Sequence, residues 1–175
     1  MDFTLRACVP GDETALALVA RGTILETYAG VGEAADVYVY VDDQLTVQHF
    51  AGLLADRSAK LWIEEAQPGG IAVGYALVRS EDAVVPFATS ELKRLYVFSR
   101  FHGAGLGARL LDVALEHARE AGTNTMFLRV HEANDKAKAF YLRYGFMVTG
   151  EEPFRAGGRD YRVFRMERTI SCRSK

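Results

Sequence analysis

The stretch Arg100–Leu111, RFHGAGLGARLL, places three glycines within five positions and then turns into a leucine-rich run. It follows ELKRLYVF (91–98), a short apolar and aromatic segment that predicts a strand. After it, leucine and alanine recur at helical spacing up to Gly122, where the helix is expected to end. A glycine-rich turn between a strand and a helix presents unpaired backbone N–H groups at the positive end of a helix dipole, which suits a phosphate.

Two phosphate-binding motifs can be compared with this turn. The Walker loop is excluded, because Gly107 is not followed by lysine and a hydroxyl residue. The dinucleotide fingerprint G-x-G-x-x-G/A is met by Gly103, Gly105 and Ala108, and Glu132 could then bind the ribose. However, the residues SRFH separate the strand from the glycines, and only one β-α-β crossover is visible. A dinucleotide-dependent oxidoreductase is therefore the weaker alternative.

The composition indicates one globular domain with almost no net charge. The chain has 175 residues, of which 49% are hydrophobic, and this is enough for a single core. We expect one domain over residues 1–170 and a short tail over residues 171–175. With 21 basic and 23 acidic residues the net charge is −2, so no global field would gather nucleic acid or a membrane surface, and we expect neither as a partner.

The cysteines and the first residues give no sign of a metal site or an export signal. Cys8 and Cys172 lie near opposite ends without metal-ligand spacing, so we expect free thiols and no metal. The start, MDFTLRACVPGDET, lacks a basic region followed by an apolar one. No apolar run approaches the ~20 residues needed to span a bilayer. We therefore expect a cytoplasmic protein.

The remaining patterns predict an α/β fold with a mixed, mostly antiparallel sheet. The expected order is β-α-α-β-β-β-α-β-α-β-β, which gives about seven strands and about four helices. Residues 30–43 show weak periodicity and are expected to form a loop. Strands are expected at 3–9, 60–66, 71–80, 91–98, 125–130, 146–152 and 159–167, and helices at 13–28, 42–56, 106–121 and 134–145.

Two segments resemble a known family. LKRLYVFSRFHGAGLGARLL (92–111) and FLRVHEANDKAKAFYLRYGF (127–146) are similar to the GNAT superfamily of acyl-CoA-dependent N-acetyltransferases. The family's Q/R-x-x-G-x-G/A signature is met by Arg100, Gly103 and Gly105. Its second motif, Asn…Ala…Phe-Tyr…Gly-Phe, is matched by Asn134, Ala137, Phe140, Tyr141, Gly145 and Phe146.

The resemblance extends beyond these motifs by pattern. The motif-bearing part runs from Glu91 to Val148, and the expected element order before and after it fits the family's GNAT-like fold. Within it ELKRLYV, and earlier in the chain ILETYA (24–29), are most similar to bacterial members that include polyamine acetyltransferases.

The resemblance implies a site for acetyl-CoA. The glycine turn would hold the pyrophosphate of coenzyme A through its N–H groups, and the preceding strand would pair through its backbone with the pantetheine arm. Asn134 would cap its helix and touch the same arm. The residues implied for coenzyme binding are Leu95, Tyr96, Val97, Arg100, Phe101, His102, Gly103, Ala104, Gly105, Leu106, Gly107, Ala108, Asn134, Ala137, Phe140 and Tyr141.

Acetyl transfer to an amine needs a base, because an alkylammonium with a pKa of about 10.4 is mostly charged at neutral pH. Glu91 is the first candidate, since it lies where the family often carries its base and could act through a water. Strand alternation predicts that it shares a face with Leu95 and Val97. The alternative is a strand-end glutamate that faces solvent or pairs with Lys93 or Arg94.

Tyr141 matches the family tyrosine that hydrogen-bonds the coenzyme sulfur and protonates the leaving thiolate. A phenol with a pKa of about 10 protonates a thiolate whose thiol has a pKa of about 8.5 only with help from the site, so a stabilising hydrogen bond is equally compatible. The alternative is a core aromatic beside Ala137 and Tyr144. His102 and His131 are weaker candidates for the base, because an unpaired histidine more often lies on the surface or in the core.

The resemblance places the acceptor between the loop after the first helix and the last hairpin. The first wall, GVGEAADVYVYVDD (30–43), has acids and no basic residue, which would favour a cationic, polyamine-like amine, although acids also serve helix caps and solvated loops. The second wall, FRAGGRDYRV (154–163), has arginines that could bind a carboxylate. The residues concerned are Glu33, Asp36, Asp42 and Asp43, then Arg155, Arg159 and Arg162, and the predicted acceptor contacts Tyr28, Tyr38, Tyr40 and Tyr161.

The sequence therefore predicts an enzyme that moves an acetyl group from acetyl-CoA to a primary amine of a small molecule by direct attack, with Glu91 as base and Tyr141 as acid. Three alternatives stay open: a protein or peptide N-acetyltransferase, a non-catalytic acyl-CoA-binding module and, as the weakest, the oxidoreductase. Neither the acceptor nor the oligomeric state follows from the sequence, and a homodimer is compatible with it.

Overall fold

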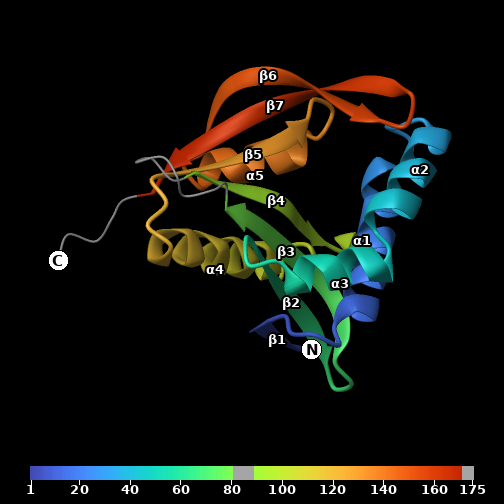
Figure 1. Ribbon diagram of the computed structural model, residues 1–175, viewed down its shortest axis with the longest axis vertical. Coiled ribbons are helices and arrows are strands. Elements are labelled where there is room, and N and C mark those ends of the chain that lie inside the picture. Colours follow the sequence, from blue (N-terminus) through green and yellow to red (C-terminus); the bar gives the residue numbers. More distant parts are fainter. Residues whose placement is uncertain (81–88, 171–175) are drawn as a thin grey trace.

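The computed structural model describes residues 1–80 and 89–170, which contain seven strands, five helices and one short 3-10 turn (Figure 1). The strands are β1 (Asp2–Ala7), β2 (Ala59–Gln67), β3 (Ile71–Ser80), β4 (Thr89–Val97), β5 (Thr125–His131), β6 (Met147–Ala156) and β7 (Arg159–Thr169). The helices are α1 (Glu13–Tyr28), α2 (Ala34–Gln44), α3 (Val47–Ala55), α4 (Leu106–Glu120) and α5 (Asp135–Arg143), and the 3-10 turn is Ser99–Phe101.

The strands form one sheet in the order β1-β2-β3-β4-β5-β7-β6. Every neighbouring pair is antiparallel except β4 with β5. These two strands pair only over Thr89–Glu91 with Thr125–Phe127 and then separate, as Figure 1 shows. The structure thus confirms the predicted mixed, mostly antiparallel α/β fold. It also places a fork in the sheet between β4 and β5, next to the glycine turn.

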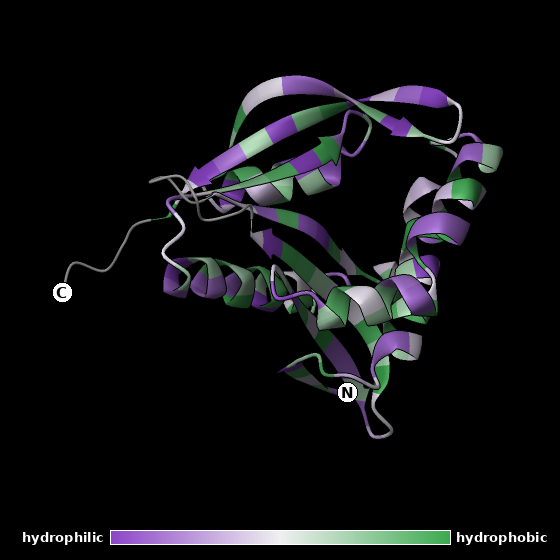
Figure 2. Cartoon of the chain, in the orientation of Figure 1, coloured by the Kyte–Doolittle hydropathy of each residue, from purple (hydrophilic) through white to green (hydrophobic). Residues whose placement is uncertain are grey.

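Two apolar clusters cover the two faces of the sheet, because alternate residues of β2 and β3 point to opposite faces. On one face, α4 and α5 pack over a cluster that includes Trp62, Val78 and Tyr141. On the other face, α1, α2 and α3 pack over a cluster that includes Ile63 and Tyr75. Figure 2 shows mostly apolar residues along β3, whereas β7 alternates between polar and apolar residues.

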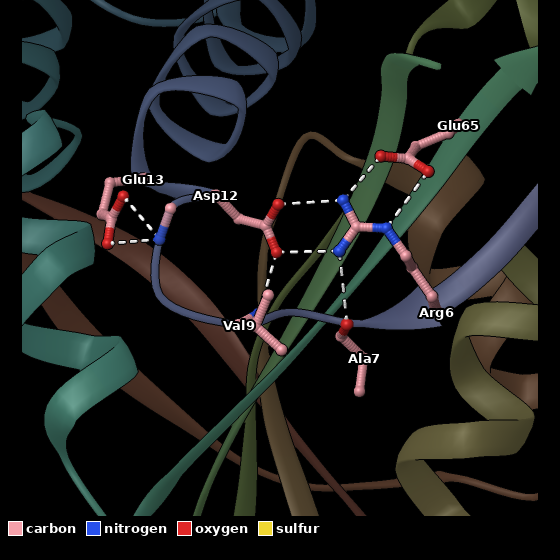
Figure 3. Close-up of polar contacts among 7 residues, drawn as sticks. Arg6, Ala7, Val9, Asp12, Glu13 and Glu65 are labelled. Carbon is pink, nitrogen blue, oxygen red and sulfur yellow. Dashed lines mark hydrogen bonds and ion pairs between the residues drawn. The ribbon is translucent and has the colours of Figure 1, made fainter.

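An arginine held between two carboxylates fixes the beginning of the chain (Figure 3). Arg6 of β1 donates to both oxygens of Asp12 at 2.8 Å, and to those of Glu65 on β2 at 2.7 and 3.2 Å. Asp12, just before α1, also accepts the N–H of Val9 at 2.8 Å, and the hydrogen bonds from Arg6 lower the pKa of its carboxyl group. These charge-assisted hydrogen bonds hold α1 against the β1–β2 edge. The last turn of α1, which borders the cavity described below, is therefore held at a fixed position relative to the sheet.

The segment after α1 forms two helices, where the sequence predicted a loop at 30–43 and one helix at 42–56. Thr46 starts α3, because its side chain accepts the N–H of His49 at 3.0 Å, and the expected caps Asp42 and Asp43 belong to α2. The buried residues of α2 are Asp36 and Val41. With so few buried apolar positions, the helix leaves almost no periodic signal in the sequence.

Strand β4 contains a bulge at Lys93. Leu92 and Arg94 pair with adjacent residues of β3, which makes Lys93 an extra residue in β4. Such an insertion reverses the faces to which all later side chains of the strand point.

This bulge corrects the expectation that Glu91 shares a face with Leu95 and Val97. Leu95 and Val97 pack against the cluster under α4, whereas Tyr96 packs against the cluster on the opposite face. Glu91 lies on the same side as Tyr96, where both border a cavity described below. Strand alternation would have placed Glu91 on the face of Leu95 and Val97 only if β4 lacked the extra residue Lys93.

Within residues 1–80 and 89–170, no helix has the length and apolarity needed to cross a membrane, and no group of histidine, cysteine and acidic side chains is placed to hold a metal ion. Cys8 has no disulfide partner within residues 1–80 and 89–170, and burial raises the pKa of its thiol to about 12. The expected tail 171–175, which contains Cys172, lies outside the described residues.

Candidate active site

The glycine turn forms the start of α4. Gly103 and Gly105 have φ angles of +86° and +81°, which glycine adopts without the strain that a side chain adds. A Cβ on either residue would meet no protein atom within 4 Å, so the space beside the turn is open. The first hydrogen bond of the helix runs from the N–H of Arg109 to the carbonyl of Gly105. The N–H groups of residues 105–108 have no main-chain partner in the described part of the chain, and this arrangement fits the pyrophosphate of coenzyme A.

Two contacts fix this turn to its neighbours. Glu26 of α1 accepts both the N–H and the hydroxyl of Ser99, each at 2.7 Å. Nε2 of His102 donates to the carbonyl of Val97 at 2.9 Å, so its ring folds back onto the end of β4. Arg100 lies exposed beside the turn, which leaves its guanidinium free to meet a phosphate.

Residues from β4, α4 and α5 meet beside the turn. A Cβ on Gly107 would lie 3.8 Å from Phe140 and 3.9 Å from Leu95, so these predicted coenzyme residues are close together. Asn134 accepts the N–H of Ala137 at 3.1 Å, which confirms its role as helix cap, while its contact with the coenzyme stays a prediction. Beyond the fork, the main chain of β4 has no strand partner on the β5 side among the described residues, which suits pairing with a pantetheine arm.

A cavity lies at the fork, on the face of the sheet that α1 covers. Strands β4 and β5 form one wall, the end of α1 together with α2 forms the second, and β6 with β7 forms the third. Its aromatic side chains are Tyr28, Tyr40, Tyr96, His131, Phe154 and Tyr161. Its charged side chains are Asp36, Glu91, Lys93 and Arg129.

Glu91 lines this cavity and is only 8% exposed, and it is the last residue of β4 that pairs with β5. One carboxylate oxygen pairs with Nη1 of Arg129 on β5, and the other lies 3.4 Å from Nζ of Lys93. Arg129 also donates to Glu152 on β6 at 2.8 Å. Two cations therefore hold the carboxylate in one orientation, facing the cavity. The predicted pairing with Lys93 is present, but the pairing with Arg94 is not.

Tyr141 lies on the opposite side of the fork, in the apolar cluster that α4 and α5 cover. The centre of its ring is 5.2 Å from that of Phe140 and 5.7 Å from that of Phe146. Burial raises the pKa of its phenol, and nearby Tyr28 adds to this shift, so Tyr141 is protonated at neutral pH. It does not line the cavity. It lies instead beside Phe140, on the side of the glycine turn.

Other proton-bearing groups line the cavity near the fork. Tyr28 and Tyr96 share a hydrogen bond, and burial raises the pKa of both phenols. Nδ1 of His131 accepts the N–H of Ala133 at 3.1 Å. This hydrogen bond orients the ring of His131 at the end of β5.

Asp36 joins α2 to the β6–β7 hairpin. One oxygen accepts the hydroxyl of Tyr161 at 2.7 Å and the other accepts the N–H of Gly158 at 3.1 Å. The hydrogen bond with Tyr161 lowers the pKa of Asp36 and raises that of Tyr161. Gly157 is required here, because its φ is +57° and a Cβ would lie 2.1 Å from an oxygen of Asp36. Helix α2 accordingly stands beside the end of the hairpin (Figure 1) and forms a wall of the cavity.

Replacing Tyr161 by phenylalanine is expected to raise the KM for the acceptor by about 3- to 10-fold, the effect of one lost hydrogen bond, because α2 is then held less firmly. Steady-state kinetics should show an unchanged KM for acetyl-CoA. Tyr38→Phe is the matched control, since Tyr38 lies on α2 but outside the cavity lining. An equal rise in both KM values for Tyr161→Phe would contradict this role.

Three of the four predicted acceptor tyrosines, Tyr28, Tyr40 and Tyr161, line the cavity. The structure does not bring Tyr38 to it, and this side chain is 59% exposed. The reason is that residues 34–44 form a helix and not a loop. Positions 36, 37 and 40 share one helical face, whereas position 38 points away from it.

The acids predicted to attract a cation are mostly directed elsewhere. Glu33 pairs with an arginine of the hairpin at 3.2 Å, Asp42 lies 3.9 Å from an arginine of α1, and Asp43 is exposed. Asp36 is the one of these acids that lines the cavity. Asp36 and Glu91 both have hydrogen-bond or ion-pair partners already.

The dinucleotide alternative finds no support in the structure. The carboxylate of Glu132 is bound by Arg162 at 2.6 Å, and is not free for a ribose. Among the described strands, β4 and β5 are the single parallel pair, whereas a dinucleotide fold repeats such units. Of the other hairpin arginines, Arg155 lies 3.6 Å from Asp160.

Sequence reasoning missed Arg129 as a cation of the cavity wall, and it considered Lys93 and Arg94 only as possible ion-pair partners of Glu91. Arg94 is 5% exposed and donates to the carbonyl of Gln44, at the end of α2, and to the hydroxyl of Tyr40. It therefore holds one end of α2, while the hairpin holds the other. The alternation in β5 could have indicated Arg129, because it interrupts an otherwise apolar strand. Nothing in the sequence indicated its carboxylate partners.

Comparison with known proteins agrees with this geometry. The family model described as "Acetyltransferase (GNAT) family" matches residues 26–146. An uncharacterized N-acetyltransferase of Mycobacterium tuberculosis (strain H37Rv) is 33% identical over 132 residues, which is 75% of this chain and 80% of that protein. The L-amino acid N-acyltransferase MnaT of Escherichia coli (strain K12) is 26% identical over 88 residues, about half of each chain.

A solved structure has the same fold. The PaiA N-acetyltransferase of Thermoplasma acidophilum, determined in complex with coenzyme A, superposes with a TM-score of 0.79 over 97% of this chain and 99% of that one, at 22% identity. The chain belongs to the acetyltransferase (GNAT) family, and it is an acyl-CoA-dependent N-acetyltransferase with acetyl-CoA as its co-substrate.

Proposed function

We propose that this enzyme moves the acetyl group to a primary amine of a small molecule, with Glu91 as general base and Tyr141 as general acid. The fork between β4 and β5 is the observation that carries the proposal. The glycine turn and Tyr141 lie on one side of the sheet there, and the cavity with Glu91 lies on the other. A donor and an acceptor bound on the two sides would meet at the fork.

Each residue has a defined task in this proposal. Glu91 takes a proton from the acceptor ammonium, directly or through a water, and leaves a neutral amine. The amine nitrogen attacks the thioester carbonyl carbon and the C–N bond forms, which gives a tetrahedral oxyanion. The nitrogen then loses its second proton to solvent, and the oxyanion collapses to the amide as the C–S bond breaks. Tyr141 gives its proton, or a hydrogen bond, to the thiolate sulfur. Beyond the fork, the N–H groups of β4 on the β5 side have no strand partner in the described part of the chain, and they offer hydrogen bonds to the oxyanion.

The aromatic lining of the cavity supports an acceptor with an apolar body. A polyamine-like acceptor was expected from the acids of residues 30–43, but Asp36 is the one of them at the cavity, and Lys93 and Arg129 would repel a polycation. The name of the Escherichia coli relative, L-amino acid N-acyltransferase, also supports a small acceptor.

A thiol-release assay with acetyl-CoA across a panel of small amines tests the proposal, with acetyl-CoA affinity measured separately by calorimetry. We expect acetyl-CoA to bind and at least one small amine to release thiol. Binding without release for any amine would instead identify an acyl-CoA-binding module. Release with peptide N-termini alone would identify a peptide acetyltransferase.

Replacing Tyr141 by phenylalanine is expected to lower kcat by about 10- to 100-fold, because the thiolate loses a hydrogen bond to a charged atom. Acetyl-CoA affinity should hardly change, since the ring remains. Tyr144→Phe is the matched control, since Tyr144 directly follows the same helix and the centre of its ring lies 4.9 Å from that of Phe140. Equal losses in the two variants would show that Tyr141 acts through packing alone.

A further inference from the structure

Of the charged side chains that line the cavity, Lys93 has the fewest hydrogen-bond and ion-pair partners among the described residues. It is the bulge residue of β4, and its side chain is 39% exposed. Among the described residues its one ion-pair partner is Glu91, whose oxygen lies 3.4 Å from Nζ. An ammonium group has three N–H donors, so most of its hydrogen-bonding capacity is unused.

The other charged groups that line the cavity are engaged. Arg129 is shared between Glu91 and Glu152. Asp36 accepts one hydrogen bond from a hydroxyl and one from a main-chain N–H. The charge that remains available to a ligand is therefore positive, and it lies beside the carboxylate proposed as the base.

We propose that Lys93 binds a carboxylate of the acceptor and that the acceptor is an α-amino acid acetylated on its amine. This inference rests on the proposed function above. Lys93 and Glu91 present a positive and a negative charge side by side, 3.4 Å apart. An α-amino acid carries its amine and its carboxylate on one carbon, so the carboxylate can meet Lys93 while the amine meets Glu91. The nitrogen is thereby placed beside its base at the fork.

The rest of the cavity specifies the side chain of this amino acid. The rings of Tyr40 and Phe154 lie 6.2 Å apart, and Val37 and Val163 also line the space. Apolar and aromatic groups gain from burial against such a surface. The acceptors that fit are therefore amino acids with apolar side chains, of the size of leucine or phenylalanine.

The test compares acceptors that differ only at the carboxylate. We would measure kcat/KM for L-phenylalanine, L-phenylalaninamide and 2-phenylethylamine, and for L-leucine, L-leucinamide and 3-methylbutylamine. The wild-type enzyme is expected to prefer the acid by about 10- to 100-fold over the other two, the effect of a charge-assisted hydrogen bond. In Lys93→Met this ratio should fall towards one, and in Lys93→Arg it should persist. The ratio is the readout, because Lys93 also contacts Glu91 and its loss will change kcat for every acceptor.

Lys60→Met is the matched control, since Lys60 lies on β2 outside the cavity lining, and it should leave the ratio unchanged. A wild-type enzyme that uses the amide or the plain amine as well as the acid would overturn the proposal, and so would a ratio that survives in Lys93→Met. Thiol release with other amines and none with these acids would overturn this inference alone. No release with any amine, despite acetyl-CoA binding, would overturn the proposed function as well.

Discussion

Glu91→Gln is expected to lower kcat by about 10²- to 10⁴-fold, the contribution of a general base, while acetyl-CoA binding is retained. The amide has nearly the same shape as the carboxylate but cannot take a proton from the acceptor. It also leaves Arg129 without one of its two carboxylate partners, and Lys93 without its one ion-pair partner among the described residues. Thiol release at saturating acetyl-CoA measures the loss, and calorimetry measures the donor affinity.

Glu152→Gln tests whether the effect of Glu91→Gln comes from the loss of a base or from the loss of a carboxylate partner of Arg129. Glu152 binds the same guanidinium of Arg129 at 2.8 Å, but it does not line the cavity. If Glu91 is the base, Glu152→Gln should reduce kcat far less than Glu91→Gln does. Equal losses in the two variants, accompanied by equal losses in thermal stability, would show that Glu91 serves only to neutralise Arg129.

Gly105→Val is expected to weaken acetyl-CoA binding by about 10- to 100-fold or more. A β-branched residue at a φ of +81° is strained, and relief of that strain would move the N–H groups at the start of α4 away from the pyrophosphate. The dissociation constant for coenzyme A, measured by calorimetry, reports this effect directly.

Gly122→Val provides the comparison for this strain. Gly122 lies just beyond the other end of α4 with a φ of +73° and no atom within 4 Å of its would-be Cβ, so the substitution creates similar strain far from the turn. It should lower the melting temperature but leave coenzyme affinity unchanged. Loss of coenzyme affinity in both variants would indicate that α4 as a whole is disturbed, and not the turn.

The parts of the molecule that the sequence predicted are those determined by neighbouring residues. Helix α4 carries a complete apolar stripe that includes Leu110, Ala114 and Ala118, and the glycine turn precedes it in the chain. The hairpin of β2 and β3 was equally clear, because QPGG separates two strand patterns. For the site, the glycine turn and the position of Asn134 as a helix cap followed from the same local signals.

The parts that the sequence could not predict depend on residues far apart in the chain. Arg129 meets Glu91 only because β4 and β5 pair at their first three residues, and this pairing has no local signal. Helix α2 is stabilised at its ends by Arg94 and by Tyr161, and not by an apolar stripe of its own. The position of Tyr38 was therefore misjudged together with the helix that carries it.

The extra residue in β4 makes the length of this strand a functional constraint in its own right. Deleting one residue between Leu92 and Leu95 would turn each later side chain of β4 to the opposite face of the sheet. Tyr96 would then point towards α4, and Leu95 would point towards the acceptor. Substitutions at single positions of β4 change one contact each. A relative that lacks one residue here would be expected to have a different acceptor pocket, even where its glycine turn is identical.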